Sequence, residues 1–244
     1  MGEGDLAAVL ESLRPAPESG GLADADAEVC ARALGVDGVA VSVTFGNGHN
    51  ELLWSTPGTS TRLEDLQFTL GQGPGPEAAA SGTAVSVPDL AREPADRWPV
   101  LLPEALALGI RAVFCLPLRV GSACLGALTL QRATAGPAQE EPLPDAWIVT
   151  HALSAALIQD GESWEAFGAA EDGSHFYRAA VHQAAGMISV QVGISLAEAL
   201  IRLRAYAFRQ GRPLNEVADD VVARRVRFHQ DDGDEPGVRG RRKD

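Results

Sequence analysis

Arginine is concentrated near the end of this 244-residue chain. Residues 176–228 contain eight arginines and four acidic residues, whereas residues 1–175 contain eight arginines and 24 acidic residues. A small basic module on a chain with a net charge of −13 is the electrostatic pattern expected of a surface that contacts a polyphosphate. The alternative is that the basic face pairs with the acidic part of its own chain, and charge alone does not separate the two.

Glycines at positions 71, 73 and 75 alternate like part of a nucleotide-binding loop. Pro74 and Pro76 interrupt them, whereas a dinucleotide fingerprint needs a helix that opens directly on its third glycine with free N–H groups. The sequence therefore favours a structural loop at this position.

Cys30, Cys115 and Cys124 lie at unrelated spacings, which does not indicate a disulfide framework. If Gly121-Ser122 is the turn of a hairpin, Arg119 faces Cys124 and Cys115 faces Leu128. The two sulfurs then lie roughly 13 Å apart along the sheet, at about 3.3 Å per residue. A disulfide requires Cα atoms within about 7 Å. We therefore predict that Cys115 and Cys124 are buried, small apolar side chains, not a redox pair.

The five histidines are scattered, and none lies at a metal-ligand spacing from a cysteine or a carboxylate. We predict no metal site, no cofactor and no enzymatic activity. No run of 18 apolar residues is present, which predicts no membrane span. The first residues are acidic and lack an apolar signal core, so we expect a cytoplasmic protein.

The elements expected to position these residues form an α+β domain with an antiparallel sheet. Helical spacing of apolar residues predicts helices, and alternation predicts strands. The predicted helices are 6–13, 22–34, 77–81, 103–108 and 144–160, and the predicted strands are 39–45, 51–55, 84–89, 111–120 and 123–132. In the last helix one apolar stripe favours packing on the sheet, with a dimerising two-helix seam as the alternative. That stripe consists of Ala146, Val149, Leu153, Ala156 and Leu157.

Three short helices follow in the basic module. The first runs from Phe176 to Val192, and Gly193 ends it as a C-cap. Ser195 and Glu198 form a capping box at the start of the second, which Gly211 closes. Pro213 starts the third. The pattern predicts a small three-helix bundle.

The first part of the chain resembles a GAF domain, the small-molecule sensor fold. The resemblance covers roughly residues 20–160. It depends on the sequences at 70–75 (Leu-Gly-Gln-Gly-Pro-Gly), 80–89, 109–118 and 125–130. It implies a ligand pocket near one end of the sheet, for which Asp89, Trp98 and Arg111 are the candidates. The favoured alternative is that Asp89 caps the following turn and Arg111 is a surface residue.

The basic module is similar to the ANTAR domain, an RNA-binding antitermination module. The matching sequences are at 183–188, 193–200, 203–207 and 212–218. One departure concerns Ala185, which stands where the family usually has Lys. Lys would reach a phosphate as a point charge and Ala cannot, so another arginine would have to make that contact.

An RNA role assigns a chemistry to each candidate side chain. Arginines position phosphates, and Met and Tyr offer surface to unpaired loop bases. Glycine permits a close backbone approach. The candidates are Arg178, Gln183, Gly186, Met187, Arg202, Arg204, Tyr206, Arg209 and Arg212. As alternatives, Met187 is core, Gly186 serves helix packing, and Arg202 and Arg209 form a solvated face. The sequence Arg224-Arg-Val-Arg227 is explained most simply as a cap that offsets the dipole of the last helix.

The expected organisation is an N-terminal helix or tail (1–20), a GAF-like sensor (21–160) and a linker (161–175). An ANTAR-like RNA-binding bundle (176–228) and a disordered charged tail (229–244) follow. The expected function is signal-responsive antitermination of transcription by a homodimer that binds hairpin loops in nascent RNA. The alternatives are a DNA-binding transcription factor and a GAF-fold redox enzyme. The acidic start of the third helix argues against the DNA-binding alternative.

Overall fold

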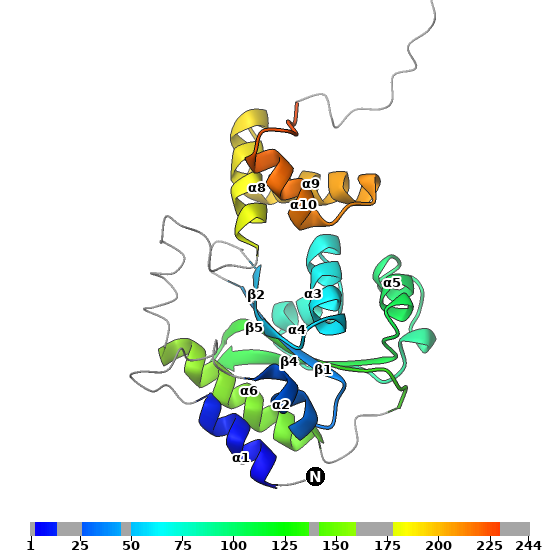
Figure 1. Ribbon diagram of the computed structural model, residues 1–244, viewed down its shortest axis with the longest axis vertical. Helices are drawn as coiled ribbons and strands as arrows, with labels where there is room; N and C mark the ends of the chain where they lie inside the picture. Colours follow the sequence, from blue (N-terminus) through cyan, green and yellow to red (C-terminus); the bar gives the residue numbers. More distant parts are fainter. Residues whose placement is uncertain (1–2, 14–25, 45–49, 137–141, 160–177, 230–244) are drawn as a thin grey trace, which may run out of the picture. The chain divides into compact units, whose positions relative to one another are not determined.

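The computed structural model describes residues 3–13, 26–44, 50–136, 142–159 and 178–229 (Figure 1). The chain divides into two compact units, Met1–Ala179 and Ala180–Asp244. The first unit is an α+β domain and the second is helical. The predicted linker (161–175) and most of the predicted charged tail lie outside the described residues.

A five-stranded antiparallel sheet forms the centre of the first unit, in the order β2-β1-β5-β4-β3. Helices cover both of its faces (Figure 1). The strands are β1 (Gly38–Thr44), β2 (Asn50–Ser55), β3 (Val85–Val87), β4 (Ala112–Val120) and β5 (Ala123–Arg132). One face carries α1 (Glu3–Ser12), α2 (Ala27–Ala33) and α6 (Pro142–Gln159), and the other carries α3 (Thr59–Leu70), α4 (Pro74–Ser81) and α5 (Leu101–Ala107).

The apolar stripe of α6 packs on the sheet, as predicted. Ala146, Val149 and Leu153 are fully buried with Phe114 and Leu128 of the strands. This stripe is therefore not free to form a seam between two copies of the chain.

Helix α3 was not expected from the sequence, and α4 begins earlier than predicted. Leu63, Leu66 and Leu70 do have helical spacing, but the buried polar residues Glu64 and Gln67 interrupt the apolar pattern. Helix α4 begins at Pro74, because a proline is tolerated in the first helical turn.

The glycines before and within α4 bind the Gln67 side chain and leave space for it. The N–H of Gly75 donates to Gln67 Oε1 at 2.8 Å, and a Cβ at Gly73 would lie 2.6 Å from the same oxygen. The prediction of a structural loop, as against a nucleotide-binding one, is confirmed at Gly75, because its N–H already donates to Gln67 and is not available to a phosphate.

The hairpin of β4 and β5 turns at Gly121-Ser122, and Arg119 pairs with Cys124 as predicted. A β-bulge between Leu118 and Arg119 then shifts the register, so Cys115 pairs with Thr129, not with Leu128. Cys115 is buried, Cys124 is only half-buried, and both are free thiols. Burial raises the pKa of the Cys115 thiol far above its ordinary range, and it raises the pKa of the Cys30 thiol to about 12.

The second unit contains α8 (Ala179–Val192), α9 (Leu196–Gln210) and α10 (Leu214–Val222). The capping box of Ser195 and Glu198 is present, and Gly211 ends α9 in the left-handed conformation. Residues 176 and 177, where the first helix was expected to begin, lie outside the described residues. Within the described ranges, no single helix is long and apolar enough to cross a membrane. Helices α8 and α9 meet that test only as a pair bent by 108°.

Candidate functional site

A groove with a volume of about 680 Å³ lies in the second unit, between α8 and the segment that follows α10. Residues of α8 and of that segment form its walls. They are Gln183, Gly186, Met187, Val190 and Gln191 from α8, and Arg224, Arg227, Phe228 and His229 from the segment.

The segment after α10 is held in place by a turn and by an aromatic anchor. Arg224 adopts a left-handed conformation (φ +60°), and the N–H of Arg225 donates to the Asp220 carbonyl at 2.7 Å. Phe228 is 6% exposed, and its N–H donates to Gln191 Oε1 at 3.3 Å. Its ring centroid lies 5.3 Å from that of Tyr206. The segment is therefore tied to α8 and to α9.

The groove combines an apolar surface with a basic edge. Val190 is 86% exposed, Met187 is half-buried beside it, and Arg224 and Arg227 are exposed. Such a surface suits a flat, apolar group flanked by negative charge, as in an unpaired nucleobase between two phosphates.

Gly186 was predicted to allow a close backbone approach, with helix packing as the alternative, and the structure contradicts the alternative. Among the described residues, and apart from its chain neighbours and the backbone of α8 itself, no atom lies within 4 Å of the position that a Cβ of Gly186 would occupy. The missing side chain instead leaves the groove open.

The structure brings together some of the predicted RNA contacts and separates others. Gln183, Gly186 and Met187 line the groove, and Tyr206 contacts its anchor, Phe228. The four candidate arginines of α9 and its end are not among the lining residues. Arg202 and Arg204 are half-buried, and Arg209 is exposed with its guanidinium 5.5 Å from the Tyr206 ring. Arg212 is paired with Asp220 at 2.8 Å.

Sequence reasoning missed Arg224, Arg227 and Phe228 as parts of this surface. The basic run was recognised, but a helix dipole explains such a run equally well. The available signal was Phe228, an aromatic residue directly after the run, which returns the chain to α8.

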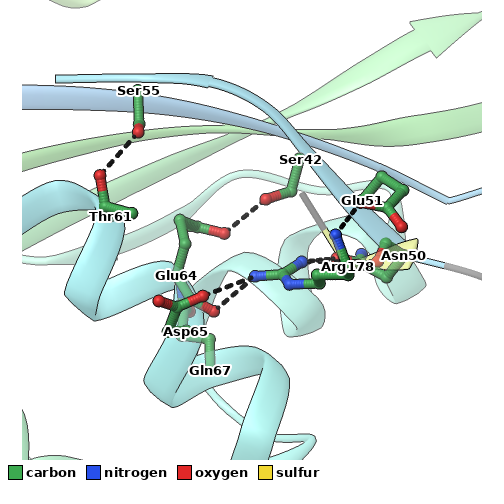
Figure 2. A network of polar contacts seen from close by, with 9 residues as sticks. All are labelled: Ser42, Asn50, Glu51, Ser55, Thr61, Glu64, Asp65, Gln67 and Arg178. Atoms are coloured by element: carbon green, nitrogen blue, oxygen red, sulfur yellow. Dashed lines mark hydrogen bonds and ion pairs between the residues drawn. The ribbon is translucent and has the colours of Figure 1, made fainter. Parts of the chain in front are cut away.

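Arg178, a predicted RNA contact, lies in the first unit and is 1% exposed. Its N–H donates to Glu51 Oε2 at 3.0 Å, its Nη1 to Asn50 Oδ1 at 2.8 Å and its Nη2 to the Glu64 carbonyl at 3.0 Å (Figure 2). The guanidinium carbon lies 3.9 Å from the centre of the Phe68 ring, and Asp65 Oδ1 lies 3.8 Å from Nη2. In this arrangement the guanidinium is enclosed by protein and does not reach a phosphate.

Comparison with known families agrees with this architecture. A model of the GAF domain matches residues 22–146, and a model of the ANTAR domain matches residues 177–222. The chain belongs to the GAF domain family. An ANTAR domain follows the GAF domain, and this combination supports a place among the GAF-regulated, RNA-binding antitermination regulators.

Solved structures support the fold of the GAF domain. The GAF domain of an Acinetobacter phosphoenolpyruvate-protein phosphotransferase is 13% identical with a TM-score of 0.50, over 66% of this chain and 96% of that one. The GAF domain of a Coxiella burnetii phosphoenolpyruvate-protein phosphotransferase is 16% identical with a TM-score of 0.51, over 66% and 95%. At these identities the likeness concerns the fold alone. No curated protein matches the sequence.

In the GAF domain, two of the three pocket candidates contact each other. Arg111 Nη2 donates to Asp89 Oδ1 at 3.0 Å, and the same oxygen accepts from the N–H of Ala91 in the following turn. The hydrogen bond from Arg111 is the main reason that the pKa of Asp89 lies below its ordinary value. Trp98 is 3% exposed within the apolar core beneath α5. Asp89 therefore caps a turn, as the favoured alternative held.

Ala185, in place of the Lys expected in the ANTAR domain, is 1% exposed and is not among the residues that line the groove. The basic edge of the groove comes from Arg224 and Arg227, which follow the matched residues of the ANTAR domain.

Proposed function

We propose that this protein is a cytoplasmic, signal-responsive regulator of transcription antitermination. Its GAF domain receives a small-molecule signal, and its ANTAR bundle binds hairpin loops in nascent RNA. The observation that carries this proposal is the groove of the bundle, which sets exposed apolar side chains beside Arg224 and Arg227.

In the proposed recognition, an unpaired loop base enters the groove beside Gly186 and contacts Met187 and Val190. Arg224 and Arg227 hold the flanking phosphates, the role that Ala185 cannot take. Aromatic and apolar contacts recognise splayed bases, whereas arginine supplies position and charge.

The proposal includes a homodimer. The inner stripe of α6 is used for the sheet, but its opposite face exposes apolar side chains: Trp147 is 37% exposed, Ile148 45% and Ile158 50%. Two copies joined through this face would present two bundles to two RNA loops.

The proposed activity is binding without catalysis. A redox role for Cys115 would need an accessible thiolate. Its thiol is 1% exposed and has a raised pKa, which supports a packing role.

The test is fluorescence anisotropy of the full chain with a two-hairpin RNA, a single hairpin and duplex DNA across a salt series. We expect the two-hairpin RNA to bind most tightly. Gly186 lines the groove and has room for a Cβ, so Gly186→Leu should occupy the groove and weaken RNA binding about tenfold, within the ~1–3 kcal/mol of one stacked base. Arg227→Ala should lower the slope of log affinity against log salt by about 0.7, as for one phosphate of a single strand.

Arg92→Ala is the matched control, because the Arg92 side chain is 87% exposed on the GAF domain. Equal binding to all three nucleic acids, unaffected by Gly186→Leu, would contradict the proposal. Preferred binding to one duplex DNA sequence would favour a DNA-binding transcription factor instead.

A further inference from the structure

The cradle around Arg178 is built by contacts that do not involve Arg178. Ser42 Oγ donates to Glu64 Oε2 at 2.5 Å, and Gln67 Nε2 donates to Glu64 Oε1 at 2.8 Å (Figure 2). Gln67 is held in turn by the N–H of Gly75. This buried chain fixes α3 against β1 and so positions the Glu64 carbonyl, Asp65 and Phe68. A site whose walls are fixed independently of its occupant is preorganised for binding.

The geometry of the cradle selects a guanidinium group. Two different nitrogens of the group donate to two acceptors, the Asn50 side chain and the Glu64 carbonyl, while the flat face lies on the Phe68 ring. A planar fork that also stacks on an aromatic face is a property of guanidinium that ammonium lacks. Glu51 and Asp65 add negative charge around it.

Arg178 lies directly before α8, so its place in the cradle affects the start of that helix. Helix α8 begins at the next residue, Ala179, and the N–H of Arg178 is itself bound by Glu51. The state of the cradle therefore acts on the backbone directly before α8.

We propose that this cradle is a binding site of the GAF domain for small guanidinium compounds, and that Arg178 is its displaceable internal occupant. A guanidinium ligand that takes its place releases the start of α8. The effect of this release on RNA binding rests on the proposed function, whereas the binding itself does not.

Displacement is feasible on energetic grounds. The Asp65 carboxylate is 37% exposed and lies 3.8 Å from Arg178 Nη2, so solvent screening limits what this ion pair contributes to holding Arg178 in place. A side chain of the same chain competes as an intramolecular ligand, at an effective concentration on the order of millimolar. A free guanidinium compound at or above that concentration can therefore compete.

Chemical rescue of the full chain tests the site without RNA. Arg178→Ala should lower the thermal midpoint, since it leaves the acidic cradle without its cation. Methylguanidinium at about 10 mM, above the effective concentration of a tethered side chain, should raise it again, whereas methylammonium at the same concentration should not. Arg92→Ala should show neither change. Equal effects of the two cations on Arg178→Ala, or none from either, would overturn the proposal.

Hydrogen exchange of the unsubstituted chain provides a second readout, which holds even where Arg178→Ala fails to fold. Methylguanidinium should make the amides of residues 178–182 exchange several-fold faster, and methylammonium should leave them unchanged. Unchanged exchange with both cations would contradict displacement. If rescue and faster exchange are observed but RNA does not bind under any condition, the guanidinium site stands and the proposed function fails.

Discussion

Two single glycines, Gly73 and Gly186, differ in whether the structure has room for a side chain. At Gly73, φ is +140° and a Cβ would lie 2.6 Å from Gln67 Oε1 and 2.9 Å from Leu101 Cδ2. At Gly186, inside α8, the space is open and the backbone is helical.

Alanine at these two positions should therefore have opposite effects on stability. Gly73→Ala should destabilise the GAF domain by about 1–3 kcal/mol, because it combines backbone strain with a collision. Gly186→Ala should stabilise α8 by up to about 1 kcal/mol, the difference in helix propensity between the two residues. Urea denaturation of the full chain with each variant measures both. A stabilising Gly73→Ala would show that the loop relaxes in a way the contacts with Gln67 do not suggest.

Helix α10 is held at both ends by one carboxylate, which is a property of the element as a whole. Asp220 Oδ2 lies 2.8 Å from Arg212 Nη1 before the helix, and Asp220 Oδ1 lies 2.6 Å from Arg225 Nε after it. These hydrogen bonds, the one from Arg225 first, hold the pKa of Asp220 below its ordinary value. A carboxylate with a lowered pKa in the folded state stabilises the fold above its unfolded pKa, and this contribution is lost as the pH falls through the folded pKa.

Asp220→Asn should consequently lower the thermal midpoint at pH 7. The difference from the unsubstituted chain should shrink as the pH falls below about 4, the ordinary pKa of an aspartate. Asp219→Asn is the control, since Asp219 is the exposed neighbour on the same helix. A constant difference from pH 7 to pH 3 would mean that the charge of Asp220 does not contribute.

The strands and most helices could be predicted because their apolar periodicity is local. Helix α3 could not, since the side chains it buries include Glu64 and Gln67, and their partners Ser42 and Gly75 lie elsewhere in the chain. The register at Cys115 failed for a related reason: the two-residue turn was predicted correctly, but a β-bulge beyond it leaves no local signature.

At the scale of the whole molecule, charge predicted a basic module and the residue motifs predicted its family, but neither predicted where Arg178 lies. Its acceptors Asn50 and Glu64 are 128 and 114 residues away in the sequence. No periodicity or motif reports such a pairing. The sequence left open whether the basic residues contact a polyphosphate or pair with the acidic part of their own chain. Arg178 does the second.

The proposed dimer would join two weak RNA-binding sites in one molecule and so raise the affinity for paired loops. Ile148 and Ile158 are 45% and 50% exposed on α6, so replacing both with glutamate should separate the copies without opening the core. Two linked sites gain affinity through effective concentration, by about 10²- to 10⁴-fold. The double variant should bind a single hairpin as the unsubstituted chain does, but its affinity for the two-hairpin RNA should fall to the single-hairpin level.

Sedimentation velocity would measure the state of association of this variant, and anisotropy would measure both RNA affinities. Val120→Glu is the control for an added charge on an exposed apolar residue, because Val120 is 39% exposed at the end of β4 and is not part of α6. A monomeric variant that still prefers the two-hairpin RNA by the full factor would place both loop contacts within one bundle. Dimers that survive both substitutions would place the interface on another surface, and the preference for paired loops would then have to be tested by disrupting that one.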